Sequence, residues 1–130
     1  MPRDVVEFFE QYRDAFDRLD GEAIADLYSV PSAIVSDRGL TTWKSREPIA
    51  ENMAALCALY RDNGYKHARF EPHHFINQGA NFAVADIAWT IEREAGAEPW
   101  HFHTTYNLCR TPKGWRVVLC TAYEEKRLNA

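Results

Sequence analysis

The sequence predicts an α+β domain in which three helical segments precede an antiparallel meander. Up to about residue 63, apolar residues recur at the three- and four-residue spacing of amphipathic helices, apart from one short β-like stretch. From Tyr65 onward the apolar residues alternate with a period of two, and short turns separate the alternating runs. Helices followed by a run of closely connected strands are typical of helices packed on one face of a sheet.

The first helix is expected over about residues 2–19, with an apolar stripe made of Val5, Phe8, Phe9, Tyr12, Phe16 and Leu19. Asp20-Gly21 interrupts this pattern, and Asp20 is a suitable N-cap for a second, short helix. That helix is expected to end at Pro31 and to carry on one face Ile24, Leu27 and Tyr28.

Two short strands are expected next, at about 32–36 and 40–44, around a turn at Asp37-Arg38-Gly39. A third helix begins after Ser45 and ends at Asn63-Gly64, and its apolar stripe is made of Ile49, Met53, Leu56, Leu59 and Tyr60. The meander then has four strands, at about 66–77, 82–93, 98–110 and 115–124.

Composition excludes several classes of protein. The 130 residues predict a single domain over 1–130, and a net charge of −4 without a basic stripe does not favour a nucleic-acid partner. No apolar run approaches the roughly 20 residues of a membrane span, and the charged, amphipathic N-terminus is unlike a signal peptide, so a cytoplasmic location is expected. The cysteines are widely spaced and indicate reduced, buried thiols: Cys57, Cys109 and Cys120.

The turns also predict the strand register, which decides the side chains that share a face. They place His73 opposite Asp86, Asp86 opposite Thr105, and Thr105 opposite Cys120. One face then gathers the polar residues His73, Asp86, His101, His103, Thr105, Asn107 and Glu124. The other gathers the apolar residues Ile87, Trp89, Ile91, Trp100, Phe102, Tyr106, Leu108, Trp115, Val117, Leu119 and Tyr123. The pattern by itself favours an apolar face against the helices and a solvated polar face.

The order of these elements, with DGEAIADLY after the first helix and KGWRVV opening the last strand, resembles the NTF2-like (SnoaL-like) superfamily over nearly the whole chain. The resemblance implies a cystatin-like cone of three helices on a curved, mostly antiparallel mixed sheet. The superfamily includes isomerases, dehydratases, epoxide hydrolases, cyclases, transport factors and association domains, so the fold does not imply one activity.

The ketosteroid-isomerase branch of this superfamily offers a second interpretation of the sheet faces. Its spacing between a tyrosine of the first helix and an aromatic of the second matches Tyr12 and Tyr28. The resemblance then implies that the polar face turns inward under the helices, and that a pocket is lined by Val84, Asp86, Ala88, Cys120 and Ala122. On the sequence alone both interpretations stay open.

Asp86 is the first catalytic candidate, because it interrupts the apolar strand FAVADIAW and a buried carboxylate needs partners. Paired with His73 or His103, it would hold an imidazole as a general base. The resemblance adds Tyr12 as a hydrogen-bond donor to a substrate oxygen and Asp37 as a second acid–base group. The structural alternatives are a buried hydrogen bond for Asp86, core packing for Tyr12 and a turn for Asp37.

A small, apolar or partly polar ligand is expected, in contact with Tyr28, Trp43, Val84, Thr105, Cys120 and Glu124. Cofactor-free acid–base chemistry of isomerase, lyase or hydrolase type fits these residues, and the alternative is a non-catalytic ligand-binding or association module. His101 and His103 form an HxH pair, but no third ligand is fixed by spacing, so a metal is not expected.

A homodimer is expected from the second interpretation of the faces. If the helices cover the polar face, the apolar face is left without intramolecular cover, and so large an apolar patch is unusual on a monomer. A two-fold symmetric partner packed sheet to sheet would bury it.

Overall fold

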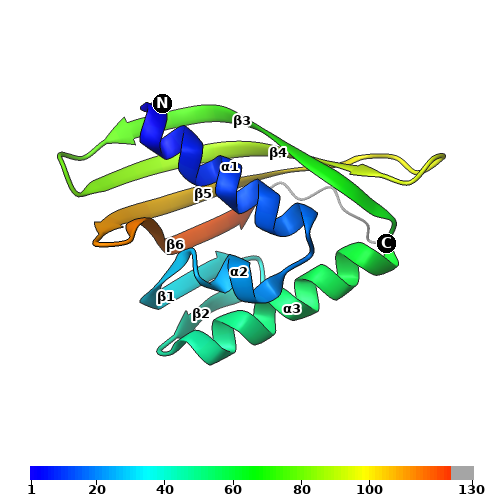
Figure 1. Ribbon diagram of the computed structural model, residues 1–130, viewed down its shortest axis with the longest axis horizontal. Helices are drawn as coiled ribbons and strands as arrows, with labels where there is room; N and C mark the ends of the chain where they lie inside the picture. The colour runs from blue at the N-terminus through cyan, green and yellow to red at the C-terminus, as the bar shows by residue number, and fades with distance from the viewer. Residues whose placement is uncertain (124–130) are drawn as a thin grey trace.

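The computed structural model describes residues 1–123 and confirms the α+β fold (Figure 1). Its elements are α1 (Arg3–Asp17), α2 (Gly21–Ala25), β1 (Tyr28–Ser36), β2 (Gly39–Trp43), α3 (Arg46–Asp62), β3 (Tyr65–Asn77), β4 (Phe82–Arg93), β5 (Trp100–Thr111) and β6 (Gly114–Tyr123). None of the helices in this described range has the length and apolar character that a bilayer span requires.

The second helix is shorter than the sequence predicts. Asp20 caps it through a hydrogen bond from the Ala23 N–H, as expected, but the helix ends at Ala25. The Leu27 carbonyl accepts a hydrogen bond from the Val117 N–H, and Tyr28 already pairs with β6. Pairing with the sheet therefore takes Tyr28 and Pro31 out of the predicted helix and into β1.

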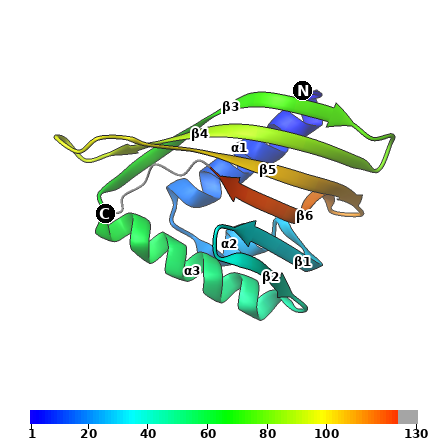
Figure 2. The same ribbon diagram turned by 180° about the vertical axis from the view of Figure 1, so that it is seen from behind.

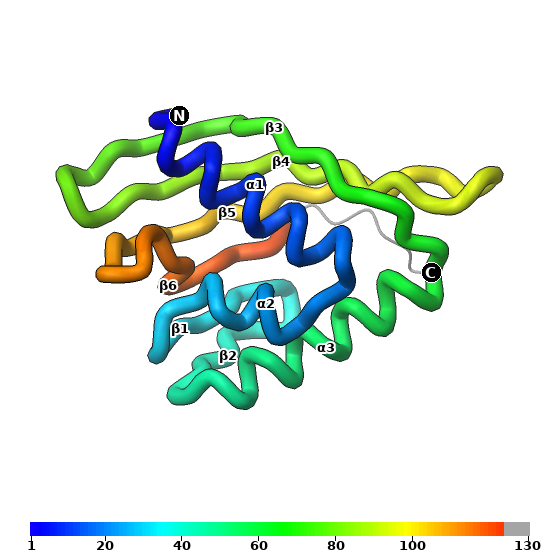
Figure 3. The backbone as a smooth tube through the Cα atoms, in the orientation of Figure 1, coloured from blue at the N-terminus to red at the C-terminus, as the bar shows by residue number. Residues whose placement is uncertain are grey.

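The described strands form one six-stranded sheet in the order β2-β1-β6-β5-β4-β3. Neighbouring strands are antiparallel except β1 and β6, which are parallel. Figure 3 shows the chain passing from α3 into β3, which runs back along the sheet edge toward the start of α1. The sheet is therefore mixed and open, with β2 and β3 as its two edges.

The helices lie over the aromatic face of this sheet, which we call the inner face. The inner side chains of β4 and β5 alternate with more exposed ones and are buried: Ile87, Trp89, Ile91, Trp100, Phe102, Thr104, Tyr106 and Leu108. Phe9 of α1 packs on Tyr106, with 5.0 Å between ring centroids. In Figure 2 the strands lie in front of α1, and no labelled helix crosses the opposite, outer face.

This arrangement corrects the interpretation that turned the polar face inward. The apolar face that was expected to need a dimer partner is covered by helices of the same chain. It therefore gives no reason to expect a sheet-to-sheet dimer. The oligomeric state itself stays a prediction without that support.

The predicted register holds between β4 and β5, where Asp86 faces Thr105 and Ala88 faces His103. It fails between β3 and β4 because the hairpin loop is one residue wider than predicted: pairing starts at Asn77 and Ala83, so that His74 rather than His73 is opposite Asp86. A first bulge, between Pro72 and His74, adds one residue to β3 and returns the later pairs to the predicted register.

The second bulge lies in β6, where Leu108 faces Val117 but Asn107 faces Leu119. Val118 is the extra residue, and it shifts all later residues of β6 by one place. Cys120 and Ala122 therefore join Tyr106 and Thr104, their cross-strand partners, on the inner face.

Gly21 provides a test of how α2 packs on α3. A Cβ at this position would lie 2.8 Å from the backbone N and 3.0 Å from the Cα of Ala54. Helix propensity alone makes Gly→Ala stabilising by about 0.5–1 kcal/mol, whereas overpacking against a backbone costs about 1–3 kcal/mol.

We therefore expect Gly21→Ala to lower the free energy of unfolding by about 1–2 kcal/mol in urea denaturation. Gly21→Ser, with one more atom at the same place, is expected to lower it further. An unfolding midpoint for Gly21→Ala above that of the native chain would contradict the close approach of the two helices.

Candidate functional site

A cavity of about 890 Å³ lies between the inner face of the sheet, the end of α1 and the length of α3. We call it the inner cavity. Its wall on α3 is mostly apolar and includes Met53, Leu56 and Leu59. Its mouth includes Asp37 and Arg38, both exposed, from the turn between β1 and β2. Its floor carries the aromatic and polar side chains of the strands, among them Trp89, Phe102, Thr104, Tyr106, Cys120 and Ala122.

Two hydrogen-bonded groups of side chains stand in this floor. The hydroxyl oxygens of Tyr12 and Tyr28 are 2.7 Å apart, and that of Tyr28 is 3.6 Å from the Cys120 Sγ. Beside them the Trp89 indole N–H donates to the Tyr106 hydroxyl over 3.0 Å. All of these residues are buried, so their polar atoms are paired with one another rather than with bulk water.

Burial decides the charge state of these groups. Desolvation raises the pKa of Tyr12 and that of Tyr28 well above the usual value, and it raises that of Tyr106 as well. Burial also raises the pKa of the Cys120 thiol to about 11. At neutral pH all four are therefore protonated, and they act toward a ligand as hydrogen-bond donors and acceptors, not as bases or thiolate nucleophiles.

The Tyr12–Tyr28–Cys120 chain can present a donor to the cavity without losing its internal bonds. If the Cys120 thiol donates to Tyr28 and Tyr28 donates to Tyr12, the Tyr12 hydrogen is directed to a third acceptor, and a ligand oxygen competes for it with the Tyr106 hydroxyl. Either oxygen of the tyrosine pair can be the donor, so this polarity requires only rotation of hydroxyl hydrogens.

Asp86 lies near both of the histidines proposed as its partners, but on the outer face and at longer distances than predicted. The Asp86 residue is 8 % exposed, and its Oδ2 accepts a 2.5 Å hydrogen bond from the Tyr123 hydroxyl. His73 Nδ1 lies 3.4 Å from Oδ2, and His103 Nδ1 lies 3.9 Å from Oδ1. The nearer contact is slightly longer than the roughly 2.6–3.2 Å of a general-base hydrogen bond.

The structure thus divides the predicted site residues between two places. Tyr12, Tyr28, Asp37 and Cys120 line the inner cavity. The other strand residues lie on the outer face and do not line the inner cavity: His73, Val84, Asp86, His103 and Thr105. Trp43 is buried against Tyr28, with 5.9 Å between ring centroids, and is not among the lining residues. Glu124 lies outside the described residues.

Sequence reasoning missed the strand residues that form most of the cavity floor, chiefly Trp89, Phe102 and Tyr106. The signal was present, because the strict alternation in β4 and β5 had already placed them on one face. Asn52, the polar lining residue of α3, had no comparable signal.

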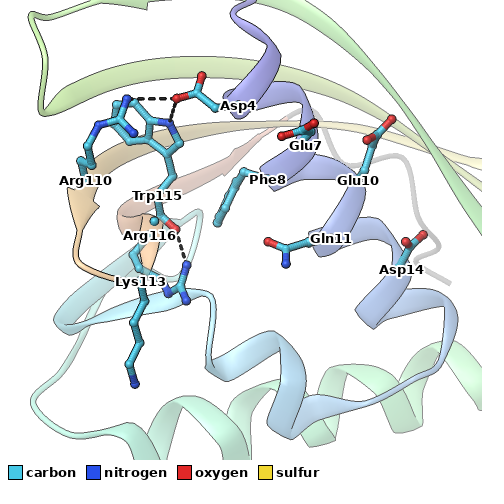
Figure 4. A pocket seen from close by; sticks show the side chains of 11 residues that line it. Asp4, Glu7, Phe8, Glu10, Gln11, Asp14, Arg110, Lys113, Trp115 and Arg116 are labelled. Atoms are coloured by element: carbon cyan, nitrogen blue, oxygen red, sulfur yellow. Dashed lines mark hydrogen bonds and ion pairs between the residues drawn. The ribbon is translucent and has the colours of Figure 1, made fainter.

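A second, smaller hollow of about 450 Å³ lies at the surface between α1 and the β5–β6 turn (Figure 4). Acidic side chains of α1 face basic side chains of the hairpin across it. Asp4 accepts hydrogen bonds from the Trp115 indole and the Arg110 guanidinium, which lower the pKa of its carboxyl. These bonds tie the start of α1 to the sheet, so the hollow is a structural junction.

Comparison with known proteins shows which family the chain belongs to. The family model described as NTF2-like protein (DUF6841) matches residues 3–125. No curated protein shows significant sequence similarity to the chain.

Several solved structures share the fold. An NTF2-like protein with a cystatin-like fold from Novosphingobium aromaticivorans is 21% identical, with a TM-score of 0.73 over 92% of this chain and 78% of that one. An NTF-2 like protein of unknown function from Shewanella oneidensis is 15% identical, with a TM-score of 0.72 over 92% of this chain and 95% of that one. A ketosteroid isomerase-like protein from Erwinia carotovora atroseptica is 15% identical, with a TM-score of 0.67 over 95% of each chain. At these identities the similarity shows the fold alone.

The tyrosine pair can be tested by a double-mutant cycle. Tyr12→Phe and Tyr28→Phe each remove one hydroxyl from the 2.7 Å contact, and we expect each to cost about 0.5–2 kcal/mol of unfolding free energy. The double variant should lose less than the sum, with a coupling of about 1 kcal/mol. Strictly additive losses in urea denaturation would mean that the two hydroxyls do not bond.

Proposed function

The chain belongs to the NTF2-like family DUF6841, and from this premise and the geometry of the inner cavity we propose that it binds a small molecule there. The ligand we propose has an apolar body and at least one oxygen that accepts a hydrogen bond. The observation that carries this proposal is the buried hydroxyl pair of Tyr12 and Tyr28 in the floor of an otherwise mostly aromatic and aliphatic cavity.

The lining determines the ligand class through its polar groups. The buried polar atoms of the floor are neutral hydroxyls, an indole and a thiol, whereas the charged lining residues described here, Asp37 and Arg38, lie at the mouth. Burying an ionised ligand deep in such a site would leave its charge uncompensated. A ketone, phenol, ether or alcohol oxygen matches the Tyr12 donor without that cost.

A specific observation favours catalysis in the same cavity. Asp37 is the one carboxylate among the described lining residues, and Tyr12 belongs to the same lining. A carboxylate that removes a proton next to a carbonyl, with a neutral tyrosine donating to that carbonyl oxygen, performs enolisation without a cofactor. Asp86, the first candidate on the sequence, takes no part in this scheme because it lies on the other side of the sheet.

Binding is tested with a pair of probes that differ by one oxygen, 2-naphthol and naphthalene, titrated calorimetrically. We expect 2-naphthol to bind about 3- to 10-fold more tightly, the value of one neutral hydrogen bond, and Tyr12→Phe to abolish the difference.

The matched variants for this test lie on β6. Ala122→Trp should fill the inner cavity and abolish binding of both probes, whereas Val118→Trp, at the exposed bulge residue, should leave binding unchanged. Equal loss in both variants, or tighter binding of naphthalene, would refute the assignment of the ligand site.

Catalysis is tested by deuterium exchange at the α-carbons of 2-tetralone in D₂O, followed by NMR. We expect the native chain to accelerate exchange and Asp37→Asn to reduce that acceleration by about 100-fold or more, as removal of a general base does. Asp86→Asn is the control and should leave the rate unchanged. Exchange that depends on Asp86 but not on Asp37 would overturn the assignment of the base.

A further inference from the structure

The outer face carries a cluster of side chains that the inner cavity does not use. His73, His74 and Asp86 each offer a ligand atom, and these atoms all lie within 4.8 Å of one another. We propose that they bind one divalent transition-metal ion, with zinc the best match. His103, whose Nδ1 is 3.9 Å from Asp86 Oδ1, stands beside the site and could supply a fourth ligand, its third nitrogen.

The β-bulge in β3 creates this cluster. Consecutive side chains of a regular strand point to opposite faces, so adjacent histidines in a strand normally cannot share one ion. Here the extra residue between Pro72 and His74 brings the two imidazole rings to the same side, with 4.2 Å between their centroids. His74 is directly opposite Asp86 in the register, and His73 reaches the same carboxylate.

The distances fit a shared ion better than a direct hydrogen bond. Two ligand atoms bonded to the same tetrahedral zinc at about 2.0–2.1 Å are roughly 3.4 Å apart. The His73 Nδ1–Asp86 Oδ2 distance is 3.4 Å, longer than the roughly 2.7–3.2 Å of an ordinary N–H···O bond. The exposed His74 ring completes the set by rotating toward the other two atoms.

Asp86 supplies an independent reason to expect a cation. The Asp86 residue is 8 % exposed, and its Oδ1 has no hydrogen-bond partner among the described residues. A buried carboxylate oxygen without a donor is costly, and a bound cation removes that cost. Tyr123 donates to Oδ2, the same oxygen that lies 3.4 Å from His73 Nδ1, and so fixes the carboxylate in place as the outer-shell groups of metal sites do, while Oδ1 stays available to the same ion.

The chemistry and the access of the site favour zinc. Imidazole nitrogen with one carboxylate oxygen is a common donor set for zinc and is poorly suited to calcium or magnesium, which take oxygen ligands. The His73 side chain is 52% exposed, so an ion reaches the buried carboxylate directly from solvent.

The competing explanation is a metal-free His73–Asp86 pair that holds or transfers a proton. Such a pair needs His73 and Asp86 and has no use for His74. His74→Ala therefore separates the two explanations, and because His74 is exposed the variant is expected to fold. His101→Ala is the matched control, since His101 is also exposed on the outer face but contacts Thr90 instead.

The experiment is calorimetric titration of zinc chloride into the full chain after treatment with EDTA and its removal. We expect one zinc per chain, binding weakened at least about 10-fold in His74→Ala and in Asp86→Asn, and His101→Ala equal to the native chain. Saturating zinc should also raise the melting temperature of the native chain and of His101→Ala, and raise that of His74→Ala by clearly less.

The proposal is overturned if the native chain shows no saturable binding, or if His74→Ala binds zinc as the native chain does. Tyr123→Phe refines the test, because loss of an outer-shell hydrogen bond should weaken binding by about 10- to 100-fold while all the ligands remain. None of these outcomes depends on the inner cavity, since its ligand probes lie on the opposite side of the sheet from the three metal ligands, which are not among its lining residues.

Discussion

The structure depends on covering the aromatic inner face of β4 and β5. Trp89 and Tyr106 expose too much apolar surface to remain in water, and α1 is the element that buries them, through Phe9 and Tyr12. Its end is fixed by Asp17, which accepts hydrogen bonds from the Tyr65 hydroxyl and the Ala68 N–H. One 15-residue helix cannot cover a six-stranded sheet, and α3 lies along the far side. The inner cavity is the volume that this incomplete cover leaves, so the same packing that stabilises the fold defines the ligand site.

Much of this could be predicted from the sequence, because periodicity is a property of many residues together. The order of helices and strands, and the register between β4 and β5, follow from long alternating runs and a short turn. The structure brings together in the inner cavity Tyr12 and Tyr28, the two residues that carried the resemblance to the ketosteroid-isomerase branch. The boundary of the second helix was wrong because pairing of Tyr28 with β6 outweighs the local helical pattern.

The strand pattern by itself correctly favoured the apolar face against the helices. The other interpretation, with the polar face inward, was wrong for a different reason, which is that a bulge is one residue and leaves no periodic signal. Val118 is a β-branched residue in a run of such residues, and nothing in GWRVVLC marks it as the extra one. Without that shift, Cys120 and Ala122 fall on the side of Asp86, and a pocket containing Cys120 appears to contain Asp86 too. The bulge at His73 has the same effect on the other edge, where it converts two adjacent histidines into neighbours on one face. Both candidate sites therefore owe their composition to single-residue irregularities.

The hydrogen bonds within the inner cavity also limit what a ligand gains there. Tyr12 and Tyr28 already bond to each other, and Tyr28 to Cys120, so the fold carries no unpaired hydroxyl that a ligand must rescue. A ligand that broke the 2.7 Å contact would gain one hydrogen bond and lose another. A ligand can instead accept a hydrogen bond from Tyr12 while the hydrogen bonds from Cys120 to Tyr28 and from Tyr28 to Tyr12 are kept. These two bonds polarise the Tyr12 hydroxyl and strengthen it as a donor. Selectivity of the cavity then rests on where the ligand places its oxygen relative to Tyr12, and the apolar lining contributes affinity with little preference among shapes.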